Sequence, residues 1–405
     1  ISACLVGSEM CIRDSYMVHF MHCAFVAMEP QTGAVKAWVG DIDFKSWKYD
    51  KVTAMRQPGS TFKLFVYTEA MNQGLTPCDK RRDEYFSMQV FDKTQNKEVT
   101  WAPTNANGYF TGDSIPLKTA FARSINSVAV RLGQEMGINR IAETAHKMGI
   151  ESPLDETPAL ALGSSDINLL ELANAYSTIA NDGKYVKRQL VTRILDRNGK
   201  EVYKSSISEE QVIPYKSAFL MQQLLMGGTR EPGGTSMSLN GYVGNFHDTD
   251  WGGKTGTSNN HSDAWFMGVS PNLVVGAWVG GEYRCIHFRT GALGQGSRTA
   301  LPICGYFLEA VLKDPAFSKY RVKFGKPKDA DITSSMYNCS SYAPRAKADT
   351  LRRDSISIEE EIILDEDGNP VERQHPTKSP SNEEKSEPAA THKKAKEEAV
   401  NFDNL

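Results

Sequence analysis

Three apolar segments between residues 252 and 281 constrain the fold more than any other feature of the chain. GGKTGT at 252–257 is short and bounded by glycine, DAWFMGVSP at 263–271 alternates, and LVVGAWVGG at 273–281 is almost continuously apolar. Each pattern is typical of a β-strand, and Pro271-Asn272 marks a turn between the last two. The segments therefore predict a cluster of neighbouring strands.

Other periodic segments place helices between this cluster and an earlier pair of strands. AFVAMEP-QTG-AVKAWVGD at 24–41 predicts a hairpin, and apolar residues recur at helical spacing in 115–150, 167–182 and 217–228. The polar stretch after residue 73, up to about Tyr109, is expected to hold little strand. This order predicts an α+β fold class, with a largely antiparallel sheet flanked by helices and a helical lobe.

Composition excludes several classes of protein. The 405 residues, 40% of them hydrophobic, suffice for a sizeable core, and the net charge of -3 gives no basic surface for nucleic acid. No apolar run reaches the roughly 18–20 residues of a membrane span. The seven cysteines show no C-x-x-C pair or zinc spacing, so we expect no metal site. Cys285 and Cys304 could pair, but free thiols are the commoner case.

The two ends of the chain differ from its middle. Residues 1–15 have no periodicity and resemble translated sequencing-adaptor sequence, so we expect them to be non-native. From 328 to 405 the chain becomes charged and rich in Ser, Pro, Lys and Glu, a composition that predicts a disordered, solvated tail. The folded domain is therefore expected to span residues 16–327.

The first motif with chemical meaning is RQPGSTFK at 56–63. Pro58-Gly59 predicts a turn, and the helical pattern that follows places Ser60 in a first turn, with Lys63 on the same face. An N-capping serine followed by a lysine would look the same, so this motif alone is weak evidence for catalysis.

Two further motifs strengthen the evidence for catalysis. Ser124-Ile125-Asn126 lies at a joint between two predicted helices, and Lys254-Thr255-Gly256-Thr257 lies on a predicted strand. In this order the three motifs match the S-x-x-K, S-x-N and K-T-G pattern of penicillin-binding proteins and serine β-lactamases.

From about residue 20 to 322 the chain closely resembles the transpeptidase domain of class A, bifunctional penicillin-binding proteins. The resemblance is carried by RQPGSTFKLFVY at 56–67, by the helical region at 160–186, and by GGKTGTSNNHSDAWFMGVSPNLVVGAWVG at 252–280. It implies a penicillin-binding/β-lactamase-like transpeptidase fold. In that family a glycosyltransferase domain and a membrane anchor precede this domain. We therefore expect a truncated piece of a membrane-anchored enzyme on the periplasmic face of the inner membrane.

The residue types suit acyl transfer. A serine hydroxyl needs a base, and because no histidine lies in a triad context, Lys63 is the candidate base for Ser60. Burial and the nearby charge of Lys254 would lower the pKa of Lys63. Ser124 fits a proton relay to the leaving amine, and Lys254 would also bind the substrate carboxylate.

The remaining site residues would hold the substrate. Asn126 can orient an amide, the hydroxyls of Thr255 and Thr257 can add hydrogen bonds, and Gly256 permits close backbone approach. By resemblance, the oxyanion hole would consist of the backbone N–H groups of Ser60 and Thr257.

The reaction implied by the resemblance is D,D-transpeptidation. Ser60 would attack the D-Ala-D-Ala amide of a peptidoglycan stem peptide on a lipid-linked glycan strand, and an amine of a neighbouring stem would resolve the acyl-enzyme. β-Lactam antibiotics would acylate the same serine, and no cofactor is implied. The acceptor amine and the oligomeric state do not follow from the sequence.

Two alternatives use the same motifs. A serine β-lactamase would need a glutamate that activates water, and Glu171 is the nearest look-alike, although it lies inside a smooth amphipathic pattern. A penicillin sensor or a catalytically silent binding domain is the second alternative. Silent domains usually lose the serine or the lysine, and both are present here.

Overall fold

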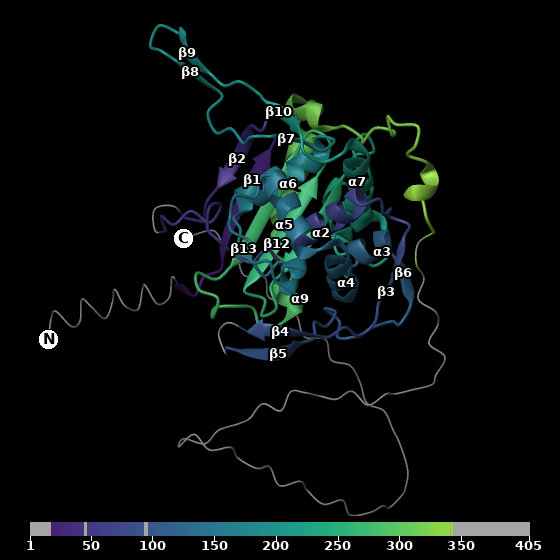
Figure 1. Ribbon diagram of the computed structural model, residues 1–405. Coiled ribbons are helices and arrows are strands. Elements are labelled where there is room, and N and C mark those ends of the chain that lie inside the picture. Colours follow the sequence, from purple (N-terminus) through teal and green to yellow (C-terminus); the bar gives the residue numbers. More distant parts are fainter. Residues whose placement is uncertain (1–17, 44–46, 93–95, 341, 343–405) are drawn as a thin grey trace, which may run out of the picture. The chain divides into compact units, whose positions relative to one another are not determined.

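A five-stranded antiparallel sheet forms the centre of the protein (Figure 1). The computed structural model describes residues 18–43, 47–92, 96–340 and 342. In spatial order the strands are β11 (Gly252–Thr257), β12 (Asp263–Val269), β13 (Val274–Gly280), β1 (His22–Met28) and β2 (Val35–Val39). Because β1 pairs with β13, the predicted hairpin and the predicted strand cluster belong to one sheet, which confirms the expected architecture.

Helices cover both faces of this sheet. Alternate residues of β12 point to opposite sides. Trp265 and Met267 belong to one hydrophobic cluster, whereas Ala264 and Phe266 belong to a second cluster. Every residue of β12 and β13 is buried, which explains why these segments are so continuously apolar. Trp265, Phe266 and Trp278 of these strands are core residues.

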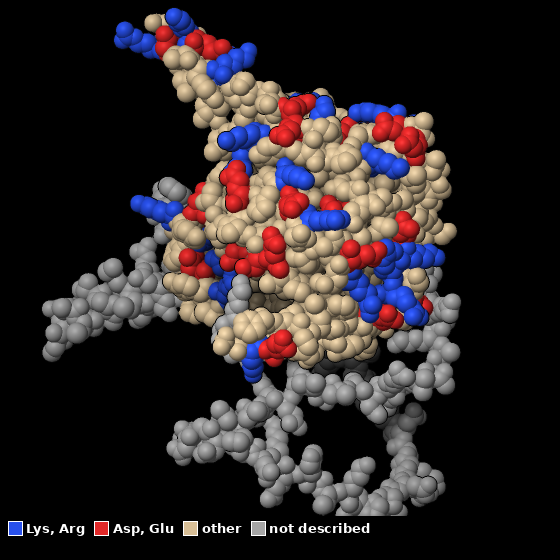
Figure 2. All heavy atoms as spheres, viewed as in Figure 1, with Lys and Arg blue, Asp and Glu red and all other residues tan. Residues whose placement is uncertain are grey.

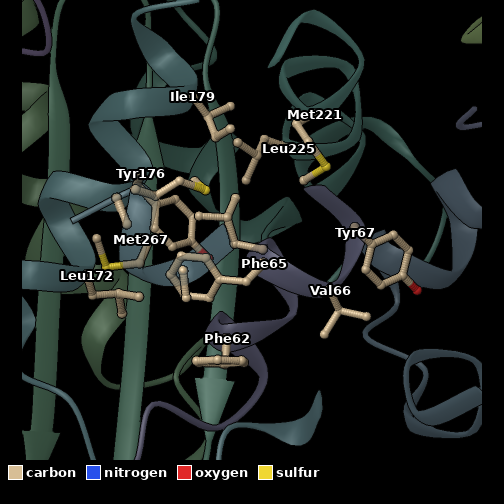
Figure 3. Packing of buried hydrophobic residues seen from close by; sticks show 14 of the residues in the cluster. Phe62, Phe65, Val66, Tyr67, Leu172, Tyr176, Ile179, Met221, Leu225 and Met267 are labelled. Atoms are coloured by element: carbon tan, nitrogen blue, oxygen red, sulfur yellow. The ribbon is translucent and has the colours of Figure 1, made fainter. Parts of the chain in front are cut away.

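The first cluster surrounds α2 (Lys63–Asn72), the helix that follows the first motif. Figure 3 shows Phe65 of α2 packed near Tyr176 of α6 (Leu169–Ala180) and Met267 of the sheet, with side chains of α7 (Tyr215–Arg230) beside them. On the other face, the second cluster is completed by α10 (Ala300–Lys313). Full burial of a Leu- or Phe-sized side chain contributes about 1.5–3 kcal/mol. Because nine of its ten residues are buried, α2 is firmly fixed.

The expected helical lobe is also present. It consists of α3 (Leu117–Ala122), α4 (Asn126–Met136), α5 (Ile138–Lys147) and the 3-10 helix η2 (Pro158–Leu162). The α3–α4 joint falls at the second motif, as the apolar periodicity predicts.

The expectation of little strand before Tyr109 is wrong, since three short strands lie in that stretch. They escape prediction because β3 is wholly polar, and because the apolar alternation of β4 and β5 covers only a few half-buried residues, too few to distinguish a strand from a loop. The remaining elements are β3 (Lys80–Arg82), β4 (Met88–Asp92), β5 (Lys97–Trp101), β6 (Ser114–Pro116), β7 (Lys184–Val186), β8 (Arg193–Leu195), β9 (Glu201–Lys204), β10 (Glu209–Gln211), α8 (Asn240–Val243), α9 (Gly291–Gly294), η1 (Gly59–Phe62), η3 (Met237–Leu239), η4 (Pro315–Tyr320) and η5 (Ser334–Met336).

The packed chain continues beyond residue 327, where the sequence analysis placed the end of the domain. Ile332 is buried in the first cluster, and Tyr342 packs against the same cluster. A disulfide joins Cys339 to Cys78. Cys285 and Cys304 are unpaired, as expected. The segments 1–15 and 343–405 lie outside the described residues.

Charge is spread over the described surface. Figure 2 shows Lys and Arg interspersed with Asp and Glu, including at the tip of the projecting β8–β9 hairpin. In the part of the chain that the structure describes, no helix has the length and apolarity needed to span a membrane.

Candidate active site

Ser60 lies in a tight turn immediately before α2. The turn is the 3-10 helix η1, and Lys63 is the first residue of the α-helix, so the predicted helix begins three residues later than its pattern suggested. Two hydrogen bonds from the core fix the turn: Tyr176 Oη donates to Thr61 O at 2.9 Å and Trp265 Nε1 donates to Gln57 O at 2.7 Å. Ser60 itself is half-buried. Its position is therefore set by buried neighbours.

The backbone of this turn lies directly against strand β11. Gly59 has φ +53°, and a Cβ on it would lie 2.6 Å from Thr257 O. A Cβ on Gly256 would lie 2.4 Å from Pro58 O. Only glycine fits at both positions, because real Cβ atoms do not approach backbone so closely. The Ser60 turn and Thr257 are consequently brought into backbone contact.

The ammonium group of Lys63 is buried and faces the second motif. Lys63 Nζ donates to Ser124 O at 2.8 Å and to Asn126 Oδ1 at 2.6 Å, and it lies 3.3 Å from Ser124 Oγ. No hydrogen bond joins Ser60 Oγ to a described residue. Catalytic hydrogen bonds are often long or absent without substrate, so this geometry does not exclude Lys63 as the base.

Lys254 approaches the same hydroxyl from the third motif. Lys254 Nζ donates to Ser124 Oγ at 2.8 Å and to Thr255 O at 2.9 Å. Ser124 Oγ therefore lies between the two buried ammonium groups. Ser124 has φ +58°, a left-handed conformation that is strained for a residue with a side chain. Such strain is typical of functional sites.

The two lysines are unusual in their protonation. Burial, followed by the charge of Lys254, lowers the pKa of Lys63 well below its usual 10.5, in the direction that the sequence analysis expected. Burial lowers the pKa of Lys254 to about 7. Near neutral pH the pair can therefore hold fewer than two protons, which makes one amine available as a base.

The second motif is held by residues that the sequence analysis did not single out. Asn105 Oδ1 accepts hydrogen bonds from the backbone N–H groups of Asn126 at 2.9 Å and Ser127 at 3.1 Å, so it caps α4 from a distant loop. Asp83 Oδ1 in turn accepts from Asn105 Nδ2 at 2.7 Å and from Ser127 Oγ at 2.6 Å. Neither residue has a sequence signal, because their partners lie more than 20 positions away.

The third motif also has an unpredicted neighbour. Thr255 Oγ1 donates to Thr235 Oγ1 at 2.7 Å. Thr235 belongs to the glycine-rich segment 227–236, for which the sequence suggested no role. Thr257 Oγ1 accepts from Gly296 N at 3.3 Å. Of the two hydroxyls predicted to bind substrate, that of Thr255 therefore lies beside a second hydroxyl, and that of Thr257 lies against the backbone of Gly296.

Residues that could support other chemistries are held in structural contacts. Glu171 Oε2 accepts from Ser152 Oγ at 2.6 Å, and Glu171 Oε1 accepts from Asn168 Nδ2 at 2.7 Å. Asp263 accepts from Trp278 Nε1 at 3.0 Å and from Ser262 Oγ at 2.8 Å, so it joins strand β13 to the loop before β12. Within the described residues, no group of three or more His, Cys, Asp or Glu side chains is arranged to hold a metal ion.

Comparison with known proteins identifies the family. Residues 23–278 match the model of the penicillin binding protein transpeptidase domain. Penicillin-binding protein 2D of Bacillus subtilis (strain 168) is 33% identical over 264 residues, which cover 63% of this chain and 36% of the relative. Penicillin-binding protein 1A of Rickettsia felis is 32% identical over 340 residues, covering 77% of this chain and 41% of the relative. The chain thus spans well under half the length of these relatives.

Solved structures of penicillin-binding proteins share the fold of this chain. Penicillin-binding protein 1A from Haemophilus influenzae superposes with a TM-score of 0.65 at 26% identity, over 73% of this chain and 48% of that chain. The PonA1 protein from Mycobacterium tuberculosis, solved in complex with penicillin V, shares the fold with a TM-score of 0.58 at 23% identity, over 72% of this chain and 78% of that chain. The expected penicillin-binding transpeptidase fold is confirmed. Because residues 23–278 match the family model and the relatives are penicillin-binding proteins, the chain belongs to the penicillin-binding protein transpeptidase family, and its relatives include class A proteins.

Proposed function

We propose that the protein is a serine D,D-transpeptidase that cross-links peptidoglycan stem peptides through an acyl-enzyme on Ser60. One observation carries this proposal: Lys63 and Lys254 both donate to Ser124 Oγ, immediately beside the Ser60 turn. A structural role alone would not require two buried ammonium groups around one hydroxyl, because burying each charge is costly.

Acylation begins at Ser60. Its hydroxyl oxygen attacks the carbonyl carbon of the penultimate D-Ala, and its proton passes to Lys63, whose pKa is lowered by burial and by Lys254. The negative charge that develops on the carbonyl oxygen is stabilised by the backbone N–H groups of Ser60 and Thr257. The contact of the Ser60 turn with β11 supports this pairing, since it brings the two backbones together.

The leaving D-Ala amine must then be protonated. Ser124 Oγ, hydrogen-bonded to Lys254 at 2.8 Å, can deliver a proton to that amine and regain one from the lysine pair. A terminal carboxylate would be bound by Lys254 and the hydroxyls of Thr255 and Thr257, and it would favour the charged form of Lys254. Asn126 would orient the substrate amide through its side-chain amide.

The acyl-enzyme is then resolved by an amine of a neighbouring stem, and the new amide is the cross-link. A β-lactam would acylate Ser60 in the same way and remain bound, because among the described residues no carboxylate that could activate water is hydrogen-bonded to Lys63, Ser124 or Lys254. Glu171, the residue that a β-lactamase would need, is occupied by Ser152 and Asn168. The observations therefore favour a transpeptidase over a β-lactamase.

The wider context follows from the same family. We propose that residues 16–327, with the packed segment as far as Tyr342, form the transpeptidase domain of a bifunctional, membrane-anchored enzyme on the periplasmic face of the inner membrane. The disulfide between Cys78 and Cys339 supports an oxidising, extracytoplasmic compartment. The intact enzyme would act on lipid-linked glycan strands.

The test is covalent labelling of the full 405-residue chain by a fluorescent penicillin, followed on a denaturing gel. We expect one label, located on Ser60 by peptide mass analysis, that persists after a chase with unlabelled drug. Ser60→Ala should take up no label, because no nucleophile remains. Label that forms and disappears within seconds would instead indicate a β-lactamase, and no label on the folded wild-type chain would indicate a silent binding domain.

A further inference from the structure

Arg123, the residue before Ser124, joins three segments that are far apart in the sequence. Its Nε donates to Pro232 O at 2.9 Å, and its Nη2 donates to Tyr342 O at 3.1 Å. Its guanidinium group also lies over the ring of Tyr342, 5.3 Å from the centroid. A planar guanidinium can make both bonds and the stacking contact at once, which a lysine cannot.

The C-terminal side of this junction is itself anchored. Cys339 is bonded to Cys78, 261 positions earlier, and the hydroxyl of Tyr342 donates to the carboxylate of Asp113. Cys78 lies just before β3 and Asp113 just before β6, and these strands pair with each other. Since β6 leads directly into α3 and Ser124, both anchors fix the β3–β6 strand pair from which the chain continues to the second motif.

The other side of the junction reaches the third motif. Pro232 belongs to the loop that carries Thr235, whose backbone N–H donates to Ala122 O at 2.9 Å. The Thr235 hydroxyl in turn contacts that of Thr255 at 2.7 Å. Arg123 thus connects the segment before Ser124, the loop beside the K-T-G strand and Tyr342.

These contacts surround Ser124, the residue with the strained backbone conformation. A left-handed conformation at a non-glycine residue persists only where the surroundings hold it, and here it points Ser124 Oγ between Lys63 and Lys254. We propose that Arg123, the disulfide-bonded Cys339 and Tyr342 act together as a positioning clamp, which holds Ser124 in its strained conformation for proton transfer. Arg123 makes no hydrogen bond to Ser60, Lys63 or Lys254, so its role is positioning rather than catalytic.

The clamp rests on the proposed function, because it assigns its effect to the acylation step. The experiment measures acylation of the full chain by a fluorescent penicillin over a range of concentrations. This separates the rate constant of acylation, k2, from the dissociation constant of the noncovalent complex, K. We expect Arg123→Ala to lower k2 at least tenfold while K changes less than twofold, and Arg123→Lys to fall between that variant and the wild type. Arg193→Ala, at an exposed arginine on β8, is the matched control and should behave as wild type.

The disulfide gives a second, independent arm. Dithiothreitol transfers two electrons and two protons to the Cys78–Cys339 bond, yields two thiols and is itself oxidised to a cyclic disulfide. We expect reduction to lower k2 of the wild-type chain several-fold. The Cys78→Ser/Cys339→Ser double variant should show the lowered k2 with or without reductant, which excludes effects on the other cysteines.

The outcomes distinguish the two proposals. A wild-type chain that takes up no label contradicts the proposed function itself. A labelled wild type whose Arg123→Ala and double-serine variants retain k2 within twofold overturns the clamp alone. A rise in K with unchanged k2 also overturns it, since that result would mean substrate binding rather than proton transfer. If Arg123→Ala does not fold, Tyr342→Ala, which removes the stacking ring at the edge of the described chain, has the same expected loss of k2.

Discussion

Two buried amines around one hydroxyl oxygen define the site at the scale of single residues. Transfer of an ammonium group out of water is costly, and a second nearby cation adds to that cost. The fold nevertheless buries Lys63 and Lys254 almost completely. As a consequence, the pKa values of both lysines are lowered, so the neutral amine that a base requires is favoured.

The pH dependence of acylation tests this arrangement. A base acts when deprotonated, and because the pKa of Lys63 is lowered, k2/K should rise with pH and reach its plateau well below pH 10.5. Lys254→Met removes the second cation, so the pKa of Lys63 should increase and the rising limb should move to higher pH. The rate should also fall by roughly 100-fold or more. The measurement is k2/K between pH 5 and 10, and a limb that stays in place or moves to lower pH would contradict the assignment.

Sequence reasoning singled out the residues that we propose to react, but not the residues that support them. Ser60, Lys63, Ser124 and Lys254 lie in short motifs whose order alone indicates the chemistry. Asn105, which caps α4, is an ordinary loop residue in the sequence. Its importance depends on which distant backbone its side chain meets, and one sequence does not specify that.

At the scale of secondary-structure elements, the backbone of the η1 turn lies directly against the backbone of strand β11. The oxyanion hole proposed above needs two backbone N–H groups from these different elements, so their separation must be set to a fraction of an ångström. Glycine at position 256 permits this approach because a side chain there would meet Pro58 O.

Gly256→Ala should therefore disable the site without unfolding the protein. Its Cβ would lie 2.4 Å from Pro58 O, which is backbone and cannot rotate away, so η1 and β11 must separate. We expect k2 to fall by roughly 100-fold, the cost of losing one oxyanion-hole donor. The rate of penicillin acylation measures the effect, and circular dichroism monitors folding.

The control is Gly241→Ala in α8. A Cβ at this position has no neighbour within 4 Å, and the residue does not have positive φ, so this variant should acylate at the wild-type rate. If Gly256→Ala retained full acylation, the close approach of the two elements would not be needed for the reaction.

The elements themselves were predictable in proportion to their burial. Strands β12 and β13 are apolar because they are covered on both faces, and their pattern identifies them in the sequence. Strands β3 and β4 are short and at most half-buried, so a hydrophobic period is absent from β3 and very brief in β4. The 3-10 geometry of η1 was also missed, because it depends on contacts with Tyr176 and Trp265.

At the scale of the whole molecule, segments from both ends of the described chain complete the same folded unit. Strand β1 pairs with β13 across more than 200 residues of intervening chain, and Cys78 is bonded to Cys339. The first pairing could be expected from the class of fold. The second could not, because a charged segment with few apolar residues gives no sign that part of it packs. A cross-link over so long a loop restricts the unfolded chain and contributes roughly 5–6 kcal/mol in the chain-entropy account.

The lowered pKa values of the lysine pair should also make the free energy of unfolding of the whole protein depend on pH. Lys254 has a pKa of about 7 when folded and near 10.5 when unfolded, and that of Lys63 is lowered as well. Between these values the unfolded chain binds more protons, so the free energy of unfolding should rise with pH from about 7 to 10, by up to ~1.4 kcal/mol per pH unit for each lysine. Lys63→Met/Lys254→Met has no such groups and should gain less from the same change. Urea unfolding of both proteins at pH 6 and pH 9 measures the difference. An equal gain in the two proteins would mean that folding does not lower the pKa values of the two lysines, and that the site holds both of them charged.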